Sequence, residues 1–235
     1  MFGNQGIPSE FKINGITINI SKEKGKVIYR RLTEEDLIEK VVLGDVTEVL
    51  FTPVEPLNLP KRLTPYLLIQ MDNSILIGPR SRSNIYLKFP IEIGCFLQND
   101  DAYQMIDVFT NSKSKFTLYG HFKSGVICKY WESAQYNKLP VCDPLNEGVL
   151  KLNLDNRTDE WVEISKVVLN AFNIKMYYTE KLVSLNAEMV IKGPEMAEVD
   201  IRDKPLKKGM NRGIEVFSPR KLEFRLSAFT MSEGL

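Results

Sequence analysis

Apolar and polar residues alternate along most of this chain, and this period of two constrains the fold more than any other feature. Apolar residues stand two apart over residues 11–20 and again over 148–154. Such alternation is typical of β-strands with one buried face. About fifteen short segments of this kind follow one another, at roughly the 8–12-residue spacing of β-sandwiches. The sequence therefore predicts an all-β protein with little helix.

The number of strands predicts more than one sandwich. An immunoglobulin-like sandwich holds roughly seven to nine strands, so we expect two packed β-sandwich units of this kind. The alternation lapses within residues 119–147, where Pro140 and Pro144 interrupt it. The alternative is one continuous unit in which a strand from each half crosses into the other. The predicted division is an N-terminal unit over 1–131, an irregular linker over 132–147 and a C-terminal unit over 148–235.

Composition limits the classes of partner. Hydrophobic residues make up 43% of the 235 residues and charged residues 26%, and the formal net charge is +1. Nucleic-acid-binding domains normally carry a basic excess, so no nucleic-acid partner is expected. No apolar run approaches the roughly 20 residues of a membrane helix, and the first residues lack the pattern of a secretory signal. We therefore expect no transmembrane segment and a cytoplasmic location.

The three cysteines, Cys95, Cys128 and Cys142, are an odd number among apolar neighbours. Without a secretory signal, this count argues against a disulfide framework. Buried free cysteine usually acts as a small hydrophobic residue. Neither Cys128 nor Cys142 stands at a zinc-site spacing from the single histidine, His121. We therefore expect reduced cysteines, no metal and no cofactor.

Catalytic motifs are absent from the sequence: it contains no nucleophile elbow, phosphate loop or dinucleotide fingerprint. One nucleophilic pairing stays open, that of His121 with Cys128, with Lys129 beside it. No third residue that would orient the histidine can be identified. An enzyme with a site at the junction of the two β units, using His121 and Cys128, is therefore the alternative hypothesis, and no catalytic residue is assigned.

Aromatic residues gather near the predicted junction. Tyr119, Tyr130 and Trp131 lie close in sequence, with Lys129 among them. Exposed aromatic side chains form binding platforms for sugars or peptides, whereas buried ones would seal an interface between the two sandwiches. The hypothesis for a binding site consists of Tyr119, Lys129, Tyr130 and Trp131.

Two further features bear on partners. The segment 204–225 is locally basic, with seven positive residues against two acidic ones, which is a weak signal for an anionic surface and is equally typical of a solvated loop followed by an edge strand. Edge strands need cover, and 148–154 or 221–229 could pair with a second copy. A homo-oligomer is therefore one expected assembly.

The chain contains a distinctive set of segments at 53–60, 86–94, 119–120, 125–131 and 161–163. Together they resemble an uncharacterised, mainly archaeal family, number four hundred and thirty-two of the domains of unknown function. The resemblance spans roughly residues 10–230. It implies one family unit across both β halves and an archaeal, cytoplasmic setting, and it carries no activity, cofactor or site residue.

The absence of a catalytic constellation favours a non-enzymatic binding or interaction module. Its partner would be a protein or a small molecule that the sequence does not identify. Function on a β-sandwich depends on the loops and open faces rather than on the fold itself.

Overall fold

The computed structural model describes residues 1–44, 46–60, 63–99, 102–216 and 228–235. Strands hold 61% of these residues, and helix accounts for 1%, in the short 3-10 turn η1 (Ala171–Asn173). The all-β prediction is confirmed, with several sheets packed together, while the immunoglobulin-like topology stays a prediction. Within the described residues, the structure contains no helix with the length and apolar character of a membrane span.

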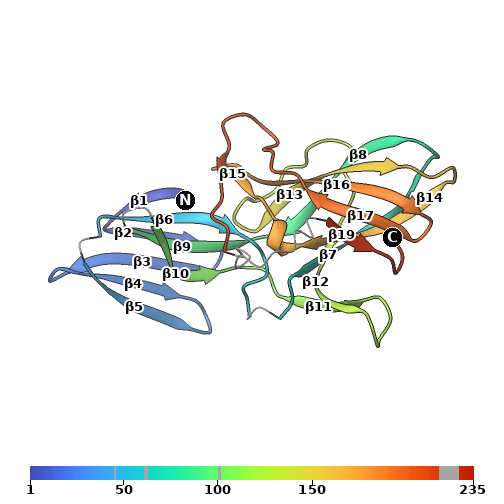
Figure 1. Ribbon diagram of the computed structural model, residues 1–235. Helices are drawn as coiled ribbons and strands as arrows, with labels where there is room; N and C mark the ends of the chain where they lie inside the picture. The colour runs from blue at the N-terminus through green and yellow to red at the C-terminus, as the bar shows by residue number, and fades with distance from the viewer. Residues whose placement is uncertain (45, 61–62, 100–101, 217–227) are drawn as a thin grey trace.

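Two four-stranded sheets form the part of the molecule on the left of Figure 1. The first has the order β1-β6-β9-β10, with β1 (Gly3–Gly6), β6 (Glu48–Val54), β9 (Glu92–Asn99) and β10 (Ala102–Phe109). The second has the order β2-β3-β4-β5, with β2 (Ser9–Ile13), β3 (Ile16–Glu23), β4 (Lys26–Leu32) and β5 (Leu37–Leu43).

Alternation explains how these two sheets pack. On β3, Ile16, Ile18 and Ile20 are buried and the residues between them are partly exposed, as expected for a strand with one face on the core. A polar link also joins the sheets. Tyr29 of β4 donates a hydrogen bond from its hydroxyl to Asp107 of β10, at 2.6 Å. The buried Asp107 thereby receives one of the partners that a buried carboxylate needs.

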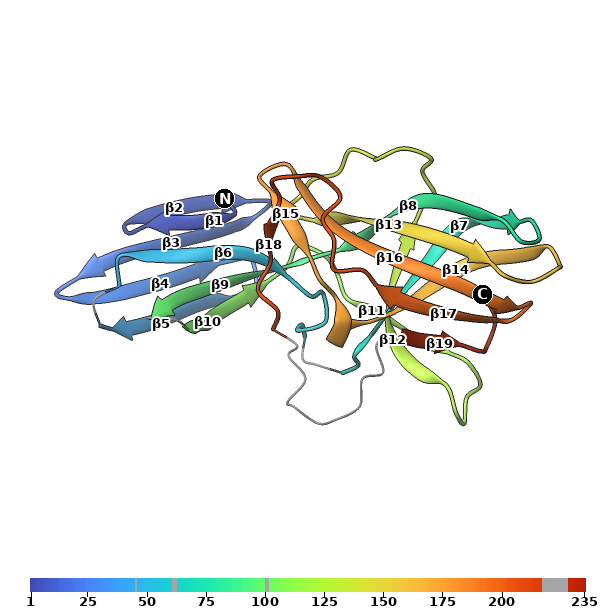
Figure 2. The ribbon, with the colours of Figure 1, turned by 45° about the horizontal axis from the view of Figure 1, so that its top comes forward.

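A four-stranded and a seven-stranded sheet form the rest of the molecule (Figure 2). One has the order β11-β12-β7-β14, with β11 (Lys115–Tyr119), β12 (Val126–Ser133), β7 (Tyr66–Ile77) and β14 (Val162–Asn170). The other has seven strands: β18 (Asn211–Arg212), β15 (Tyr177–Thr179), β16 (Leu182–Gly193), β13 (Glu147–Asn156) and β8 (Arg82–Pro90) in that order, with β17 (Met196–Ile201) and β19 (Ala228–Met231) continuing from β16.

Strand β13 is central to the seven-stranded sheet because it pairs antiparallel with β8 and parallel with β16. Its leucines, Leu150, Leu152 and Leu154, are buried in the core. The alternate residues Lys151 and Asn153 are only partly buried and lie on the opposite, outer face of the sheet. This outer face carries the candidate site.

The sheets do not follow the order of the chain. Strands β7 and β8 precede residue 132, yet they pair with β14 and β13, which follow residue 147. Such pairing matches the alternative of strands that cross between the halves, and the division within 119–147 stays a prediction for limited proteolysis. Since β13 is paired on both sides, 148–154 offers no free edge to a second copy. Most of the other proposed edge, 221–227, lies outside the described residues.

Candidate functional site

Two of the four residues in the sequence-based binding site are buried. Tyr119 is 4% exposed, and its hydroxyl donates to the Gly234 carbonyl and accepts from the Glu233 amide, both at 3.1 Å. Both hydrogen bonds of this hydroxyl are made within the chain, and they hold the C-terminal residues against β11. The phenol is not available as a binding platform.

Lys129 is 2% exposed and forms an ion pair with the fully buried Glu92, at 2.9 Å between Nζ and Oε1. The same carboxylate accepts hydrogen bonds from the backbone amides of Asn58, at 2.9 Å, and Leu59, at 3.2 Å. We call these four residues the junction cluster, because they join β9 of the first sheet pair to β12 of the second. Buried charges require such pairing, so Lys129 serves the structure here.

Tyr130 and Trp131 are half-buried and line a small cleft of about 220 Å³ with Lys113, Lys115 and Glu132. The indole Nε1 of Trp131 is buried and has no hydrogen-bond partner in the described part of the chain. Of the four expected residues, the structure thus brings these two together at an accessible surface.

The proposed nucleophile and base lie in different environments. His121 is exposed in the turn between β11 and β12, where its ring contacts Phe122. Cys128 is fully buried, and burial raises the pKa of its thiol to about 12. A thiol with this pKa is not ionised at neutral pH and is a poor nucleophile. The geometry therefore offers no support for a Cys–His enzyme.

All three cysteines are free thiols, and only Cys142 is partly exposed. The described ranges contain no group of three or more histidine, cysteine, aspartate or glutamate side chains that could hold a metal ion.

A broad hollow lies over the outer face of the seven-stranded sheet. It consists of two adjoining pockets, of about 500 Å³ and about 380 Å³, that share Leu139 and Lys207. We call the two together the lysine groove. Tyr86 of β8, Lys151 of β13 and Asn186 of β16 form one row across three paired strands and provide its floor.

Two loops form the walls of the lysine groove. The loop before β13 runs along β8, where the backbones of Tyr86 and Tyr136 exchange two hydrogen bonds of 2.9 Å, and then supplies Leu139 to Cys142. The loop after β17 is tied down where the Arg202 amide donates to the Asn186 carbonyl, at 2.7 Å. Both walls are therefore held to the sheet by backbone hydrogen bonds.

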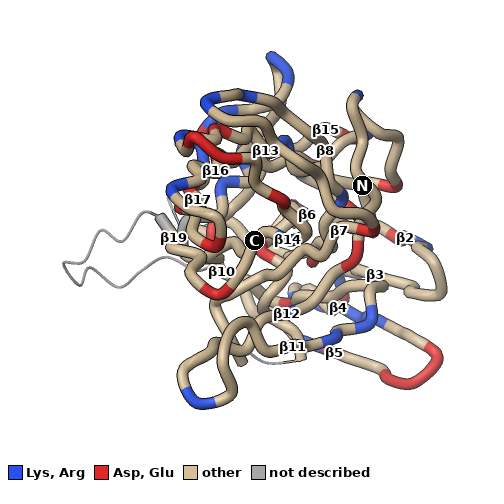
Figure 3. Tube along the Cα trace, turned by 90° about the vertical axis from the view of Figure 1, so that its right-hand side faces the viewer, with Lys and Arg blue, Asp and Glu red and all other residues tan. Residues whose placement is uncertain are grey.

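Four lysines line the groove: Lys151, Lys181, Lys204 and Lys207. None of them forms an ion pair or a side-chain hydrogen bond with another described residue. Neighbouring cations differ in this respect: Lys88, one row further along β8, is paired with Glu147 at 2.9 Å, and Arg202 is paired with Glu188. Figure 3 shows further Lys and Arg positions on the loops beyond β13 and β15. The lysine groove is thus a concave surface with uncompensated positive charge.

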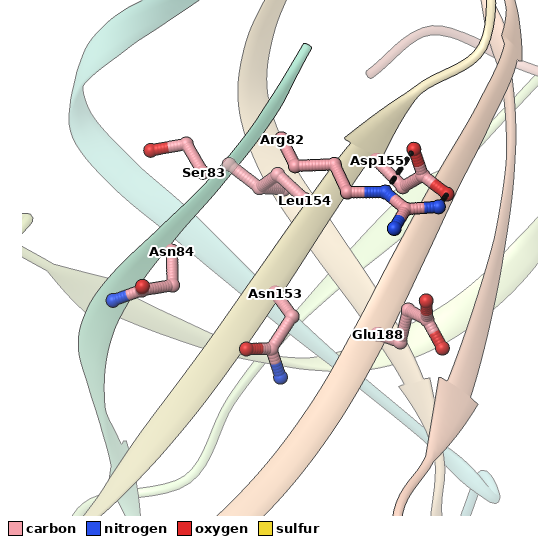
Figure 4. Close-up of a pocket in the computed structure, with 7 residues that line it drawn as sticks. All are labelled: Arg82, Ser83, Asn84, Asn153, Leu154, Asp155 and Glu188. Carbon is pink, nitrogen blue, oxygen red and sulfur yellow. Dashed lines mark hydrogen bonds and ion pairs between the residues drawn. The ribbon is translucent and has the colours of Figure 1, made fainter.

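A polar shelf continues from the groove along the same strands (Figure 4). Asn84, Asn153 and Glu188 form the next row, two residues further along β8, β13 and β16. Beyond them, Arg82 makes two hydrogen bonds to Asp155, at 3.1 and 3.2 Å. These residues line a pocket of about 300 Å³, in which Arg82 is paired with Asp155 and Glu188 is paired with Arg202 from outside the pocket.

Sequence reasoning found only part of this site. Lys204 and Lys207 belong to the basic segment 204–225, which carried a weak anion signal. Lys151 and Lys181 lie outside this segment. The parallel pairing of β13 with β16 brings Lys151 to the groove, and Lys181 lies in the turn between β15 and β16. The alternation of β13 placed Lys151 on an outer face but could not indicate what covers that face.

A family model matches residues 1–232, and its description is "Protein of unknown function (DUF432)". The match covers nearly the whole chain, and the protein belongs to this family. The resemblance seen in the sequence is thereby confirmed, although its archaeal distribution stays an expectation. No curated protein and no solved structure matches the chain.

Proposed function

We propose that this protein is a binding module that takes a small anionic ligand in the lysine groove. The observation that carries the proposal is the set of four lysines in one hollow, without an ion pair among the described residues. Other exposed lysines of the described chain also lack an ion pair, so what distinguishes these four is that they line one hollow together. The groove offers a charge that a ligand would neutralise.

Lysine ammonium groups bind phosphate and carboxylate as point charges. Because the whole chain has a formal net charge of only +1, attraction at the groove is local rather than a property of the entire surface. Local attraction across exposed side chains is screened by salt. Binding should therefore weaken as ionic strength rises.

Isothermal titration calorimetry with inorganic pyrophosphate tests the proposal. The double variant Lys204→Gln/Lys207→Gln should bind at least about tenfold more weakly, because two charge-assisted contacts are lost. Lys208→Gln is the matched control, since Lys208 is exposed beside Lys207 but does not line the groove. Absence of pyrophosphate binding to the unmodified protein, or equal losses in the double variant and the control, would overturn the proposal.

The cleft at Tyr130 and Trp131 is a second candidate, for a protein or small-molecule partner. The buried indole Nε1 of Trp131, without a described partner, supports it, because buried donors are rarely left unpaired. Trp131→Phe keeps most of the packing and removes this donor, so it should impair partner capture without unfolding the chain. Capture that is unchanged in Trp131→Phe would remove the candidate.

Homo-oligomerisation and a cytoplasmic setting remain part of the proposal as expectations from the sequence. Light scattering of the purified protein tests the first, with a mass of twice the chain or more as the supporting result.

A further inference from the structure

The polar shelf beside the lysine groove points to the chemistry of the rest of the ligand. We infer that the anionic ligand is a phosphorylated sugar, with its phosphate among the lysines and its hydroxyl groups over Asn84 and Asn153. This inference rests on the proposed anion-binding function and names the ligand class for the same groove.

Continuity of the surface is the first support. Lys151 and Asn153 are two residues apart on β13, as are Asn186 and Glu188 on β16 and Tyr86 and Asn84 on β8. Residues two apart on a strand point to the same face and lie roughly 7 Å from each other. One small ligand can therefore contact the lysine row and the asparagine row together.

Unused hydrogen-bonding groups are the second support. The Asn153 amide nitrogen donates to Asn186 Oδ1 and to the Ala187 carbonyl, both at 2.9 Å, which leaves its own Oδ1 as an acceptor. The exposed Asn84 amide makes no hydrogen bond within the described residues. An amide that both donates and accepts matches a hydroxyl group, which does the same.

Charge distinguishes the two ends. The lysine row is uncompensated, whereas Asp155 is paired with Arg82 and Arg157 and Glu188 is paired with Arg202. A second anionic group over the shelf would meet carboxylates whose guanidinium partners are already engaged. The shelf therefore favours a neutral, hydroxylated portion, and Tyr86, which lines the groove in the lysine row, supplies an aromatic side chain beside a sugar ring.

Calorimetry with glucose 6-phosphate, ribose 5-phosphate and inorganic phosphate as separate probes tests the inference. At least one sugar phosphate should bind about tenfold more tightly than inorganic phosphate, the factor that one or two net hydrogen bonds supply. Asn84→Ala and Asn153→Ala should each reduce that ratio of affinities toward one. Asn19→Ala, on a strand of the other sheet pair, is the matched control and should keep the ratio.

The outcomes separate the two proposals. If inorganic phosphate binds through Lys204 and Lys207 but neither sugar phosphate binds more than twofold more tightly, the sugar inference is overturned and the anion site stands. If pyrophosphate binds but none of the three probes does, the sugar inference alone is overturned, and if pyrophosphate fails to bind as well, both are overturned. Because the Asn84 side chain makes no hydrogen bond to the described chain, Asn84→Ala should fold normally, and an unchanged ratio in this variant would also overturn the inference.

Discussion

The junction cluster and the lysine groove place the same kind of side chain in opposite situations. Lys129 is buried, with its ammonium 2.9 Å from the carboxylate of Glu92, which also accepts two backbone hydrogen bonds. Lys151 and Lys207 line an open hollow, and neither has an anionic partner among the described residues. The contrast indicates that an ion-paired lysine stabilises the fold, whereas an unpaired lysine is available to a ligand.

The two regions should also differ in the effect of removing a charged side chain. A buried ion pair is held in place by the penalty for leaving either charge alone, so changes at the junction cluster should act on stability. The groove lysines are solvated, and their loss should act on binding. The following predictions test this difference, beginning with the largest effect.

Lys129→Met should destabilise the fold by about 3–5 kcal/mol, the usual cost of removing one partner of a buried ion pair. The Glu92 carboxylate would stay buried beside an apolar side chain. Urea unfolding measures the change, and Lys113→Met, in the exposed cleft, is the control. The double variant Lys129→Met/Glu92→Leu should recover part of the loss. A change below about 1 kcal/mol in the single variant would contradict the structural role of Lys129.

Tyr119→Phe should lower the free energy of unfolding by about 1–2 kcal/mol, because it removes two hydrogen bonds to Glu233 and Gly234. Tyr103, which is 48% exposed, supplies the control Tyr103→Phe. If Tyr119→Phe leaves stability unchanged and impairs capture of a partner, Tyr119 belongs to a binding surface after all.

Acid should weaken the far end of the polar shelf. Hydrogen bonds from Arg82, and then from Arg157, hold the pKa of Asp155 below its ordinary value. A carboxyl group with a lowered pKa stabilises the fold above about pH 4 and loses that contribution as pH falls through the folded-state pKa. The difference in unfolding free energy between the protein and Asp155→Asn should therefore shrink between pH 7 and pH 3.

This effect should be the smallest of the three, since the guanidinium groups of Arg82 and Arg157 are largely exposed to solvent. Asp36→Asn is the control, because Asp36 is exposed and its side chain makes no ion pair among the described residues. A difference for Asp155→Asn that grows toward low pH would contradict the assigned direction of the pKa.

Local patterns were enough to predict the strands but not their partners. Alternation correctly indicated β3 and β13, because each has one face on the core. It could not indicate that β12 pairs in parallel with β7, or β13 with β16, since parallel pairing joins segments that are distant in sequence. For this reason the lysine groove, which depends on that pairing, was visible only as the basic residues near 204.

The sequence pattern also did not predict that both faces of a strand would be buried. Cys128 and Lys129 are adjacent on β12 and both are buried, whereas alternation predicts that one of two neighbours is exposed. Lys129 is covered because it meets Glu92 from the other sheet pair. Lys129 is therefore unavailable to a ligand because of the interface between the sheet pairs, which the pattern of its own strand does not indicate.

Alkylation of Cys142 gives the most direct test that an anion occupies the lysine groove. Cys142 lines the groove with Lys181 and Lys207. Its thiol is partly exposed, whereas Cys95 and Cys128 are fully buried, so iodoacetamide should react with Cys142 alone in the folded protein. Increasing pyrophosphate should slow this reaction to a saturating limit, and Lys204→Gln/Lys207→Gln should abolish the protection. A rate that is the same with and without pyrophosphate, under conditions where calorimetry shows binding, would place the anion elsewhere and contradict the assignment.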